Sequence, residues 1–441
     1  MGNLLGSPVT EKDTHLGTTP DGLIYAVSSM QGWRIHMEDA HITETNVHAQ
    51  RPTRTEDAPL ERLPLAGHSI FAVFDGHGGS FAAQYAAANF CRVLARQPKF
   101  VAYAKFVQER PQKEASMSGD AAEKAQYVRS GLELLEGALR DAFVDIDRET
   151  ILAVKGDTVV EANTPYNEPT PPPTTTASPS SGDDSSDPAM GGGSSTGSST
   201  ANSAPTPNED EDSGTTAVVV VVTPQWVICA NAGDSRAVFA KQGNQPVPLS
   251  YDHKPDDEEE TRRIKAAGGY VAGGRVEGDL AVSRGLGDFR FKEEKTVLAG
   301  SANFKAGAGD DEDANMLDAD DQKVSPVPDI IVQNRNADSD EFIIVACDGI
   351  WDVLTNYDAS KAVAAMFAEG ESDMGLVCEE LIDMCLRLGS KDNMTALIIR
   401  FPAQQIGEGE GVTGRRAARA AAEKSAAGAD GAGVEDEASP Q

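Results

Sequence analysis

Two apolar runs in this sequence end in the same dipeptide. The run "IFAVF" (70–74) precedes Asp75-Gly76, and the run "FIIVAC" (342–347) precedes Asp348-Gly349. A short apolar run bounded by turn residues is typical of a buried strand, and Asp-Gly is typical of a tight turn. Either Asp-Gly alone indicates no more than a turn. The pair predicts a core in which buried strands emerge at an edge and end in carboxylates.

Further strands and helices are predicted around these two runs. Apolar patterns indicate strands at 22–32, 69–74, 215–222, 225–230, 236–240, 329–334, 341–347 and 394–401. Three- and four-residue spacing of apolar positions indicates helices at 80–97, 128–146, 256–269, 357–369 and 374–388. The strands cluster along the chain with short turns, which favours antiparallel sheets packed against helices in an α+β fold.

Low-complexity inserts interrupt this ordered sequence. Length alone favours two or three domains, but strand-like sequence resumes directly after each insert. We therefore expect one domain over 20–402, with disordered inserts at about 161–213 and 295–327. An N-terminal segment (1–19) would precede the domain. An Ala-, Gly- and Glu-rich flexible tail (403–441) would follow it.

The charge of the chain is strongly acidic, with a formal net charge of −32. The stretches 161–214 and 306–322 hold nine and seven acids and no Lys or Arg, so half of the excess lies in the inserts. An acidic chain argues against nucleic acid and anionic membranes as main partners. The acids at 306–322 could bias against acidic substrates or bind a basic partner, and a solvated spacer is an equally good interpretation.

Other sequence signals concern the compartment. No signal peptide is evident, and no apolar run approaches the roughly 18 residues of a transmembrane helix. The 5 cysteines form no C-x-x-C pair and read as reduced core thiols, which fits an intracellular protein, cytoplasmic or nuclear. Membrane attachment is expected only if Gly2 is myristoylated, and Gly6 stands where that motif has Ser or Thr. We expect a monomer.

Carboxylates outside the inserts carry the chemistry. Besides Asp75 and Asp348, the segment "LAVSRGLGD" ends at Asp288, and "GWRIHMEDAH" holds Glu38 and Asp39. Carboxylates brought together would repel one another and raise one another's pKa. Hard divalent cations such as Mg²⁺ or Mn²⁺ resolve that repulsion. The C-x5-R, phosphate-loop, kinase H-R-D and H-E-x-x-H patterns are all absent from the sequence.

Eight motifs in order resemble one known family. The segments "SMQGWRIHMEDAH", "FAVFDGHGG", "GTTAVVVVV", "ANAGDSRAV", "DHKPDDEEETRRIKAAGG", "LAVSRGLGDF", "VACDGIWDVL" and "GSKDNMTALII" are similar to those of the metal-dependent protein serine/threonine phosphatases, type 2C or PPM. The resemblance covers about 20–402 apart from the inserts. It implies a four-layer αββα sandwich, in which two central antiparallel sheets are flanked by helices and two Mg²⁺ or Mn²⁺ ions bind at one end.

The resemblance also implies metal ligands. Asp75 would bridge both ions, and the Gly76 carbonyl would bind one of them. Asp288 and Asp348 would ligate the other ion. Glu38 would act mainly through metal-bound water, and Asp39 would lie close to it.

Two further residues would act on the substrate. Arg34 would bind the phosphate, and His77 would protonate the departing serine or threonine oxygen. Phosphoserine and phosphothreonine in proteins would be hydrolysed by a metal-bridged hydroxide that attacks phosphorus directly, without a phosphoenzyme.

Several positions keep an alternative interpretation. A third ion would involve Glu211, Asp212 and Asp392, although Glu211 stands where the family pattern has Asp. Asp234 reads as a turn residue rather than a ligand, and Asn393 as support for the site. The alternative function is a catalytically weak module that binds phosphoproteins or a regulator on the same fold. A nucleotide enzyme is the remote third.

Overall fold

The computed structural model describes residues 4–51, 60–117, 121–156, 166, 212–243, 245–298 and 317–430. Two antiparallel sheets form its centre. The larger has six strands, in the spatial order β1 (Leu4–Thr18), β2 (Ile24–Arg34), β18 (Met394–Arg400), β17 (Asp340–Ala346), β11 (Arg236–Lys241) and β12 (Gln245–Pro248). The smaller has five, in the order β16 (Asp329–Asn334), β10 (Trp226–Ala232), β9 (Ala217–Val222), β6 (Ser69–Phe74) and β3 (Ala40–Glu44).

The buried side chains of β9 show how the layers form. Successive side chains of a strand point to opposite faces. Val218 and Val220 therefore pack with Ile343 and Val345 of β17 in the core between the two sheets. Val219 belongs to a second core, which the five-stranded sheet shares with helices. A run of valines is explained by a strand that is covered on both faces.

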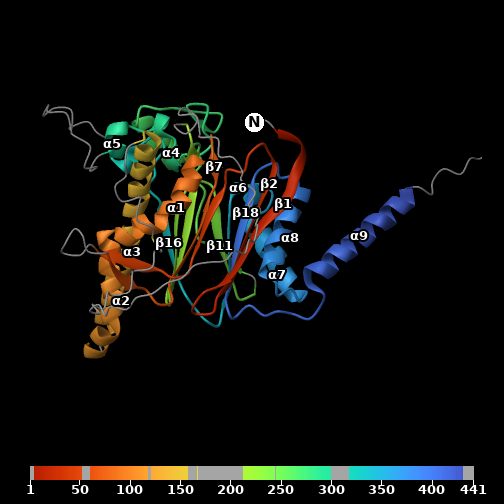
Figure 1. The fold of residues 1–441 in the computed structure, drawn as a ribbon, viewed down its shortest axis with the longest axis horizontal. Helices are drawn as coiled ribbons and strands as arrows, with labels where there is room; N and C mark the ends of the chain where they lie inside the picture. Colours follow the sequence, from red (N-terminus) through yellow and green to blue (C-terminus); the bar gives the residue numbers. More distant parts are fainter. Residues whose placement is uncertain are drawn as a thin grey trace, which may run out of the picture.

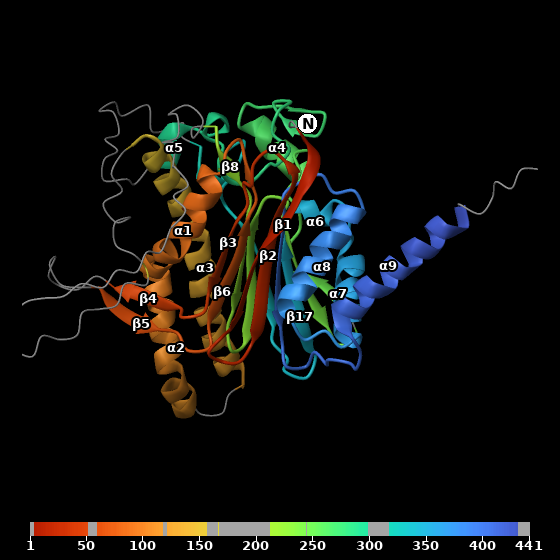
Figure 2. The same cartoon turned by 45° about the vertical axis from the view of Figure 1, so that its right-hand side comes forward.

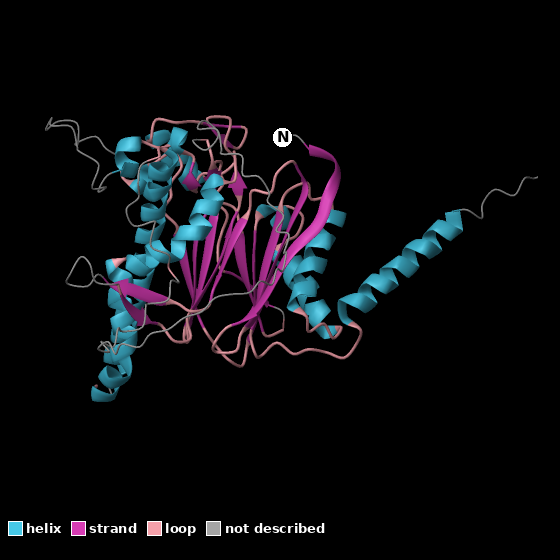
Figure 3. Cartoon of the chain, viewed as in Figure 1, coloured by secondary structure: helices cyan, strands magenta, loops and turns pink. Residues whose placement is uncertain are grey.

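Helices cover the two outer faces of the sheets. The five-stranded sheet packs against α1 (Phe81–Arg96), α2 (Pro98–Ser116) and α3 (Ala121–Val154). The six-stranded sheet packs against α7 (Asn356–Ala368) and α8 (Met374–Arg387). Figures 1 and 2 show these helices on opposite sides of the strands, and Figure 3 shows the strands between them. The expected α+β sandwich with flanking helices is confirmed. Helix α2 was not predicted from the sequence.

Short elements close the upper end of the sandwich in Figure 1. A three-stranded sheet there is formed by β15 (Leu286–Gly287), β8 (Gly214–Thr215) and β7 (Gly76–His77). Nearby are α4 (Glu258–Ala266), α5 (Glu294–Leu298) and α6 (Asp348–Trp351). The 3-10 turn η1 (Phe289–Phe291) follows β15 directly in the chain. Apart from the C-terminal helix, the remaining elements are β4 (His48–Arg51), β5 (Glu61–Pro64), β13 (Val271–Ala272), β14 (Arg275–Val276) and the 3-10 turn η3 (Ala319–Asp321).

The N-terminal boundary at residue 20 is wrong. Strand β1 covers Leu4–Thr18 and pairs with β2 along the edge of the six-stranded sheet. The segment lacks an apolar alternation because its side chains are exposed or half-buried, while its backbone supplies the pairing. The Lys12–Asp383 ion pair, with Nζ and Oδ1 2.7 Å apart, ties β1 to α8. Gly2 lies outside the described residues, so its myristoylation stays a prediction.

The expectation of a flexible tail from residue 403 is wrong for its first part. Residues Gly411–Asp430 form α9, which starts on the body of the domain and then projects from it (Figure 1). Val412 is buried, and its N–H donates to Glu371 Oε2 at 3.0 Å. Arg416 and Arg419 both pair with the buried Glu380 of α8. Residues 431–441 lie outside the described residues.

The two predicted inserts begin and end differently from expectation. Residues 294–298 are helical, and from 317 onward the chain packs, with Val324 and Val327 buried. Residues 299–316, which hold the first part of the acidic stretch 306–322, lie outside the described residues. In the first insert, Tyr166 is buried and its ring stacks on His48 with centroids 4.2 Å apart. Residues 157–165 and 167–211 lie outside the described residues. Within the described part of the chain, no helix is long and apolar enough to cross a membrane.

Candidate active site

Three aspartates from three strand ends meet at the upper end of the sandwich. Asp75 follows β6, Asp348 follows β17 at the start of α6, and Asp234 lies in the turn between β10 and β11. One carboxylate oxygen of each lies within 4.8 Å of the others. Asp75 and Asp348 were expected to lie at such an edge. Asp234 lies in a turn, as expected, and its carboxylate also lies beside those of Asp75 and Asp348.

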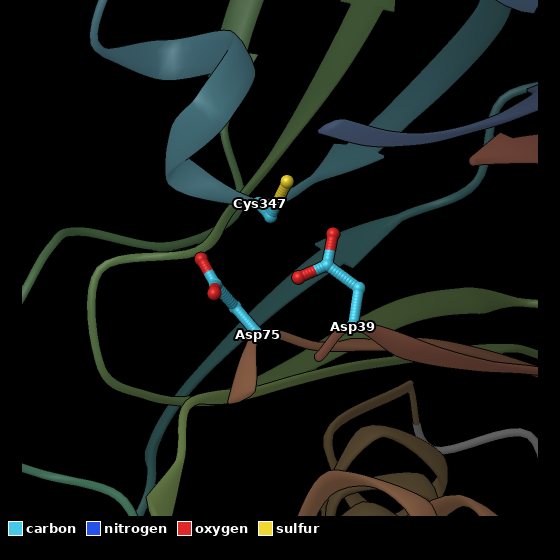
Figure 4. A group of neighbouring side chains, drawn as sticks. All are labelled: Asp39, Asp75 and Cys347. Atoms are coloured by element: carbon cyan, nitrogen blue, oxygen red, sulfur yellow. The ribbon is translucent and has the colours of Figure 1, made fainter. Parts of the chain in front are cut away.

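A second group shares Asp75 and includes Asp39 and Cys347. Their side chains converge in Figure 4, with one ligand atom of each within 4.8 Å of the others. Thr395 Oγ1 donates to Asp39 Oδ2 at 2.7 Å. The other oxygen, Oδ1, is buried and has no hydrogen-bond partner among the described residues. A buried carboxylate oxygen without a donor is costly, so this oxygen is free to accept from a water or a cation.

The electrostatics of the cluster favour a bound cation. Burial and the charges of Asp348, Asp39 and Asp234 raise the pKa of Asp75 well above its usual range. Burial, together with Asp234, does the same to the pKa of Asp348. Burial raises the pKa of Asp39 to about 6 against the opposing hydrogen bond from Thr395. These carboxylates destabilise one another when ionised, and a hard divalent cation reverses that effect with the oxygen donors it prefers. The donor set fits Mg²⁺ or Mn²⁺.

Two glycines are required by close approach in this region. A Cβ on Gly76 would lie 2.4 Å from the backbone oxygen of Glu38. A Cβ on Gly214 would lie 2.3 Å from Asp288 Oδ2 and 2.4 Å from His77 Nε2. Any side chain at either position would displace the acidic residues or the histidine. The glycines therefore let the backbone and the functional side chains pack closely.

His77 and Asp288 form a hydrogen-bonded pair beside the aspartate cluster. His77 Nε2 lies 2.9 Å from both Asp288 oxygens. Burial lowers the pKa of His77, but the charge and hydrogen bond of Asp288 outweigh it, so the pKa is raised above its usual value. A raised pKa favours the protonated imidazolium, which can donate a proton. The structure pairs Asp288 with His77, and Asp288 is not a member of either carboxylate cluster in the described residues.

Glu38 and Asn393 support the loop that carries Asp39. Glu38 Oε1 accepts from the Gly79 N–H at 3.0 Å, and the Glu38 N–H donates to Asn393 Oδ1 at 2.9 Å. Asn393 Nδ2 donates to the carbonyls of Gln31 and His36 at 2.8 and 2.9 Å. The expected role of Asn393 as support for the site is therefore confirmed.

Arg34 reaches the site from the end of β2. Its guanidinium contacts Asp392 Oδ2 at 2.5 Å, and its side chain is 39% exposed. Burial lowers the pKa of Arg34, but Asp392, Asp348 and Asp75 outweigh it, so the pKa is raised. Asp392 is thus engaged by Arg34, while Asp212 is exposed and Glu211 lies outside the described residues. A third ion at these three acids stays a prediction.

Comparison with known proteins gives the family. Residues 24–160 and 147–394 match the family described as Protein phosphatase 2C. The chain is 32% identical over 407 residues to Protein phosphatase ppm-1.A of Caenorhabditis elegans, covering 91% of this chain and 64% of that protein. It is 30% identical to Protein phosphatase 2C homolog 2 of Schizosaccharomyces pombe, covering 91% of this chain and 79% of that protein.

The chain belongs to the protein phosphatase 2C family. The expected resemblance is thereby confirmed, and with it the class of enzyme, because the relatives are named protein phosphatases. The chain spans slightly less than two thirds of the C. elegans relative. A phosphatase structure from Toxoplasma gondii shares the fold at a TM-score of 0.54 and 18% identity, covering 90% of this chain and 97% of that one. A serine-threonine phosphatase 2C from the same organism matches equally at 0.54 and 20% identity.

Proposed function

We propose that this protein hydrolyses phosphoserine and phosphothreonine in proteins with the help of Mg²⁺ or Mn²⁺. The observation that carries the proposal is the cluster of Asp75, Asp234 and Asp348, whose oxygens lie within 4.8 Å of one another. A cationic side chain, Arg34, and a protonatable one, His77, flank that cluster. Together they supply anion binding and a proton donor next to a cation site, which is what phosphate-ester hydrolysis requires.

Asp75, Asp348, Asp288 and the Gly76 carbonyl would hold two divalent cations. When bound, such ions supply positive charge that stabilises the phosphoryl group and lowers the pKa of water. Glu38 and Asp39 would act through water, since Asp39 Oδ1 is a buried acceptor without a donor in the described residues. Asp234 is a further candidate ligand through its place in the cluster.

Arg34 would bind the substrate phosphate. A guanidinium presents a planar fork of donors that matches two phosphate oxygens and keeps its charge at any working pH. Asp392 holds that guanidinium at the rim of the site. The partly exposed side chain is accessible to a phosphorylated segment of another protein.

His77 would donate an imidazolium proton to the departing serine or threonine oxygen. The pairing with Asp288 favours the charged imidazolium and fixes its direction. An alkoxide leaves poorly, so such a donor contributes roughly 10²- to 10⁴-fold in rate. We propose direct attack by water, without a phosphoenzyme, and an intracellular monomer as the working form.

The test is hydrolysis of a phosphothreonine peptide by the purified full chain. We expect turnover with added Mn²⁺, loss of turnover with EDTA, and loss in Asp75→Ala. Undiminished turnover in Asp75→Ala refutes the proposed site. Stable capture of phosphopeptide without any metal-dependent turnover would favour the binding-module alternative.

A further inference from the structure

A buried ion pair lies behind the active site, between α3 and the segment that carries Asp288. Lys292 Nζ lies 2.8 and 2.9 Å from the two carboxylate oxygens of Asp147. The two side chains are 0% and 2% exposed. Neither residue belongs to the aspartate cluster, and the proposed chemistry uses neither. A buried pair is by itself weak evidence for stability, because desolvation can exceed the attraction of the charges.

The same pair binds the short segment directly before Asp288, which includes strand β15. Asp147 Oδ1 accepts the N–H of Gly287 at 2.7 Å, and Lys292 Nζ donates to the carbonyl of Gly285 at 2.9 Å. Asp147 therefore accepts a hydrogen bond from an N–H of this short segment, and Lys292 donates one to a carbonyl of the same segment. Each charged group thus binds both its partner and the backbone of that segment.

The backbone at Asp288 needs such support. Asp288 has φ 53° and Gly287 has φ 76°, so two successive residues adopt the left-handed region. A residue with a side chain is uncommon in that region, and it persists there when surrounding contacts impose that conformation. In addition to the contacts that Asp147 and Lys292 make with this segment, the Asp288 N–H donates to the Ser213 carbonyl at 3.1 Å. The conformation aims the Asp288 carboxylate at His77.

We infer that Asp147 and Lys292 are positioning residues, whose buried ion pair fixes the Asp288 carboxylate in the orientation required for cation binding and for pairing with His77. This inference rests on the proposed function, since it gives Asp288 a role toward a cation. Asp147 and Lys292 touch neither substrate nor cation, and they act only through the backbone of 285–288. Groups that orient metal ligands typically change metal affinity about 10- to 100-fold when they are replaced.

The test compares Mn²⁺ affinity with stability in three variants of the full chain. Asp147→Asn leaves Lys292 buried without a counter-ion, and Lys292→Met leaves Asp147 in the same state. The double variant Asp147→Asn/Lys292→Met removes both charges and keeps an amide oxygen for the Gly287 N–H. Melting temperature in EDTA measures stability, and calorimetric titration with Mn²⁺ alone measures affinity.

The chain offers a matched control on the same helix. Glu149 of α3 pairs with Arg92 of α1, with Arg92 Nη1 and Glu149 Oε1 3.2 Å apart. The side chains of Arg92 and Glu149 are 2% and 15% exposed. The double variant Arg92→Met/Glu149→Gln thus removes a second, largely buried ion pair. Among the described residues, this pair makes no hydrogen bond to 285–288. This double variant should affect melting temperature while leaving Mn²⁺ affinity unchanged.

We expect the single variants at Asp147 and Lys292 to melt at lower temperature and to bind Mn²⁺ about 10- to 100-fold more weakly. The double variant Asp147→Asn/Lys292→Met should recover the wild-type melting temperature but still bind Mn²⁺ more weakly. A pair that served only stability would recover both properties together. Wild-type affinity in the double variant overturns the inference, and so does an equal loss of affinity in the Arg92/Glu149 control. Wild-type protein that binds Mn²⁺ without hydrolysing phosphopeptide would refute the proposed function and leave this inference standing.

Discussion

Replacing Asp75 with Asn should stabilise the metal-free protein. Asparagine keeps the shape of the side chain and an oxygen acceptor, and it removes one negative charge from the cluster with Asp234 and Asp348. The raised pKa of Asp75 means that folding favours its protonated form. Ionisation of Asp75 therefore costs stability, and this cost appears as the pH rises above the carboxyl's usual value.

The size of the effect follows from the distances. Two unit charges at 4.8 Å, the upper limit of the separations in the cluster, repel by about 3.5 kcal/mol at an effective dielectric constant of about 20. Partial protonation relieves some of this repulsion, so we expect Asp75→Asn to raise the free energy of unfolding by about 1–3 kcal/mol near pH 8. The gain should shrink toward zero as the pH falls below about 4, where the wild-type carboxyl is protonated in both states.

Bound Mn²⁺ should make the wild type more stable than Asp75→Asn. A ligand at 100 times its dissociation constant stabilises the native state by about 2.7 kcal/mol, and this gain is available to the wild type alone. Urea denaturation in EDTA and in excess Mn²⁺ measures both effects. Asp338→Asn, at an exposed position in the β16–β17 turn, is the matched control and should change neither. An Asp75→Asn protein that is less stable than the wild type in EDTA would refute the proposed repulsion, and so would equal stabilisation of both proteins by Mn²⁺.

Three further outcomes are expected. Burial raises the pKa of Glu260, but hydrogen bonds from Arg284 and charges of Arg263 outweigh it and lower the pKa to about 2. Glu260→Gln should therefore lower the free energy of unfolding by up to about 3 kcal/mol at pH 7, with the difference vanishing between pH 4.5 and 2 in acid-unfolding curves. Asp234→Asn should weaken Mn²⁺ binding in a calorimetric titration, and an unchanged affinity would assign Asp234 to its ion pair with Lys254 alone. Arg34→Lys should raise KM for a phosphopeptide about 10- to 100-fold by removing the planar fork of donors, and steady-state kinetics with an unchanged KM would contradict that role.

The central strands and the site aspartates could be predicted because their signals are local. Each buried strand is a contiguous apolar run, and Asp75 and Asp348 follow such runs directly. Antiparallel pairing then brings strand ends together at one edge. The remaining site residues, including His77 and Arg34, were predicted from the resemblance of the eight ordered motifs to the phosphatase family.

Other features could not be read from the sequence because their partners are distant. In the sequence, Arg416 and Arg419 of α9 resemble solvated residues of a tail. Only the structure shows that both pair with Glu380 of α8. Strand β1 has no apolar face of its own, since it is held by backbone pairing at a sheet edge. Asp147 and Lys292 are 145 residues apart, and neither stands in a pattern that indicates burial of a charge. Asp234 lies in a turn, and only the folded structure brings its carboxylate next to those of Asp75 and Asp348.

The most direct test of the account is the dependence of turnover on cation occupancy at the aspartate cluster. Mn²⁺ binding and phosphothreonine-peptide hydrolysis are measured on the same samples across a series of Mn²⁺ concentrations, for wild type and Asp348→Asn. The account predicts that turnover follows occupancy in the wild type and that both are lost together in the variant. Turnover that persists at negligible occupancy, or an Asp348→Asn protein that binds and hydrolyses as the wild type does, would contradict it.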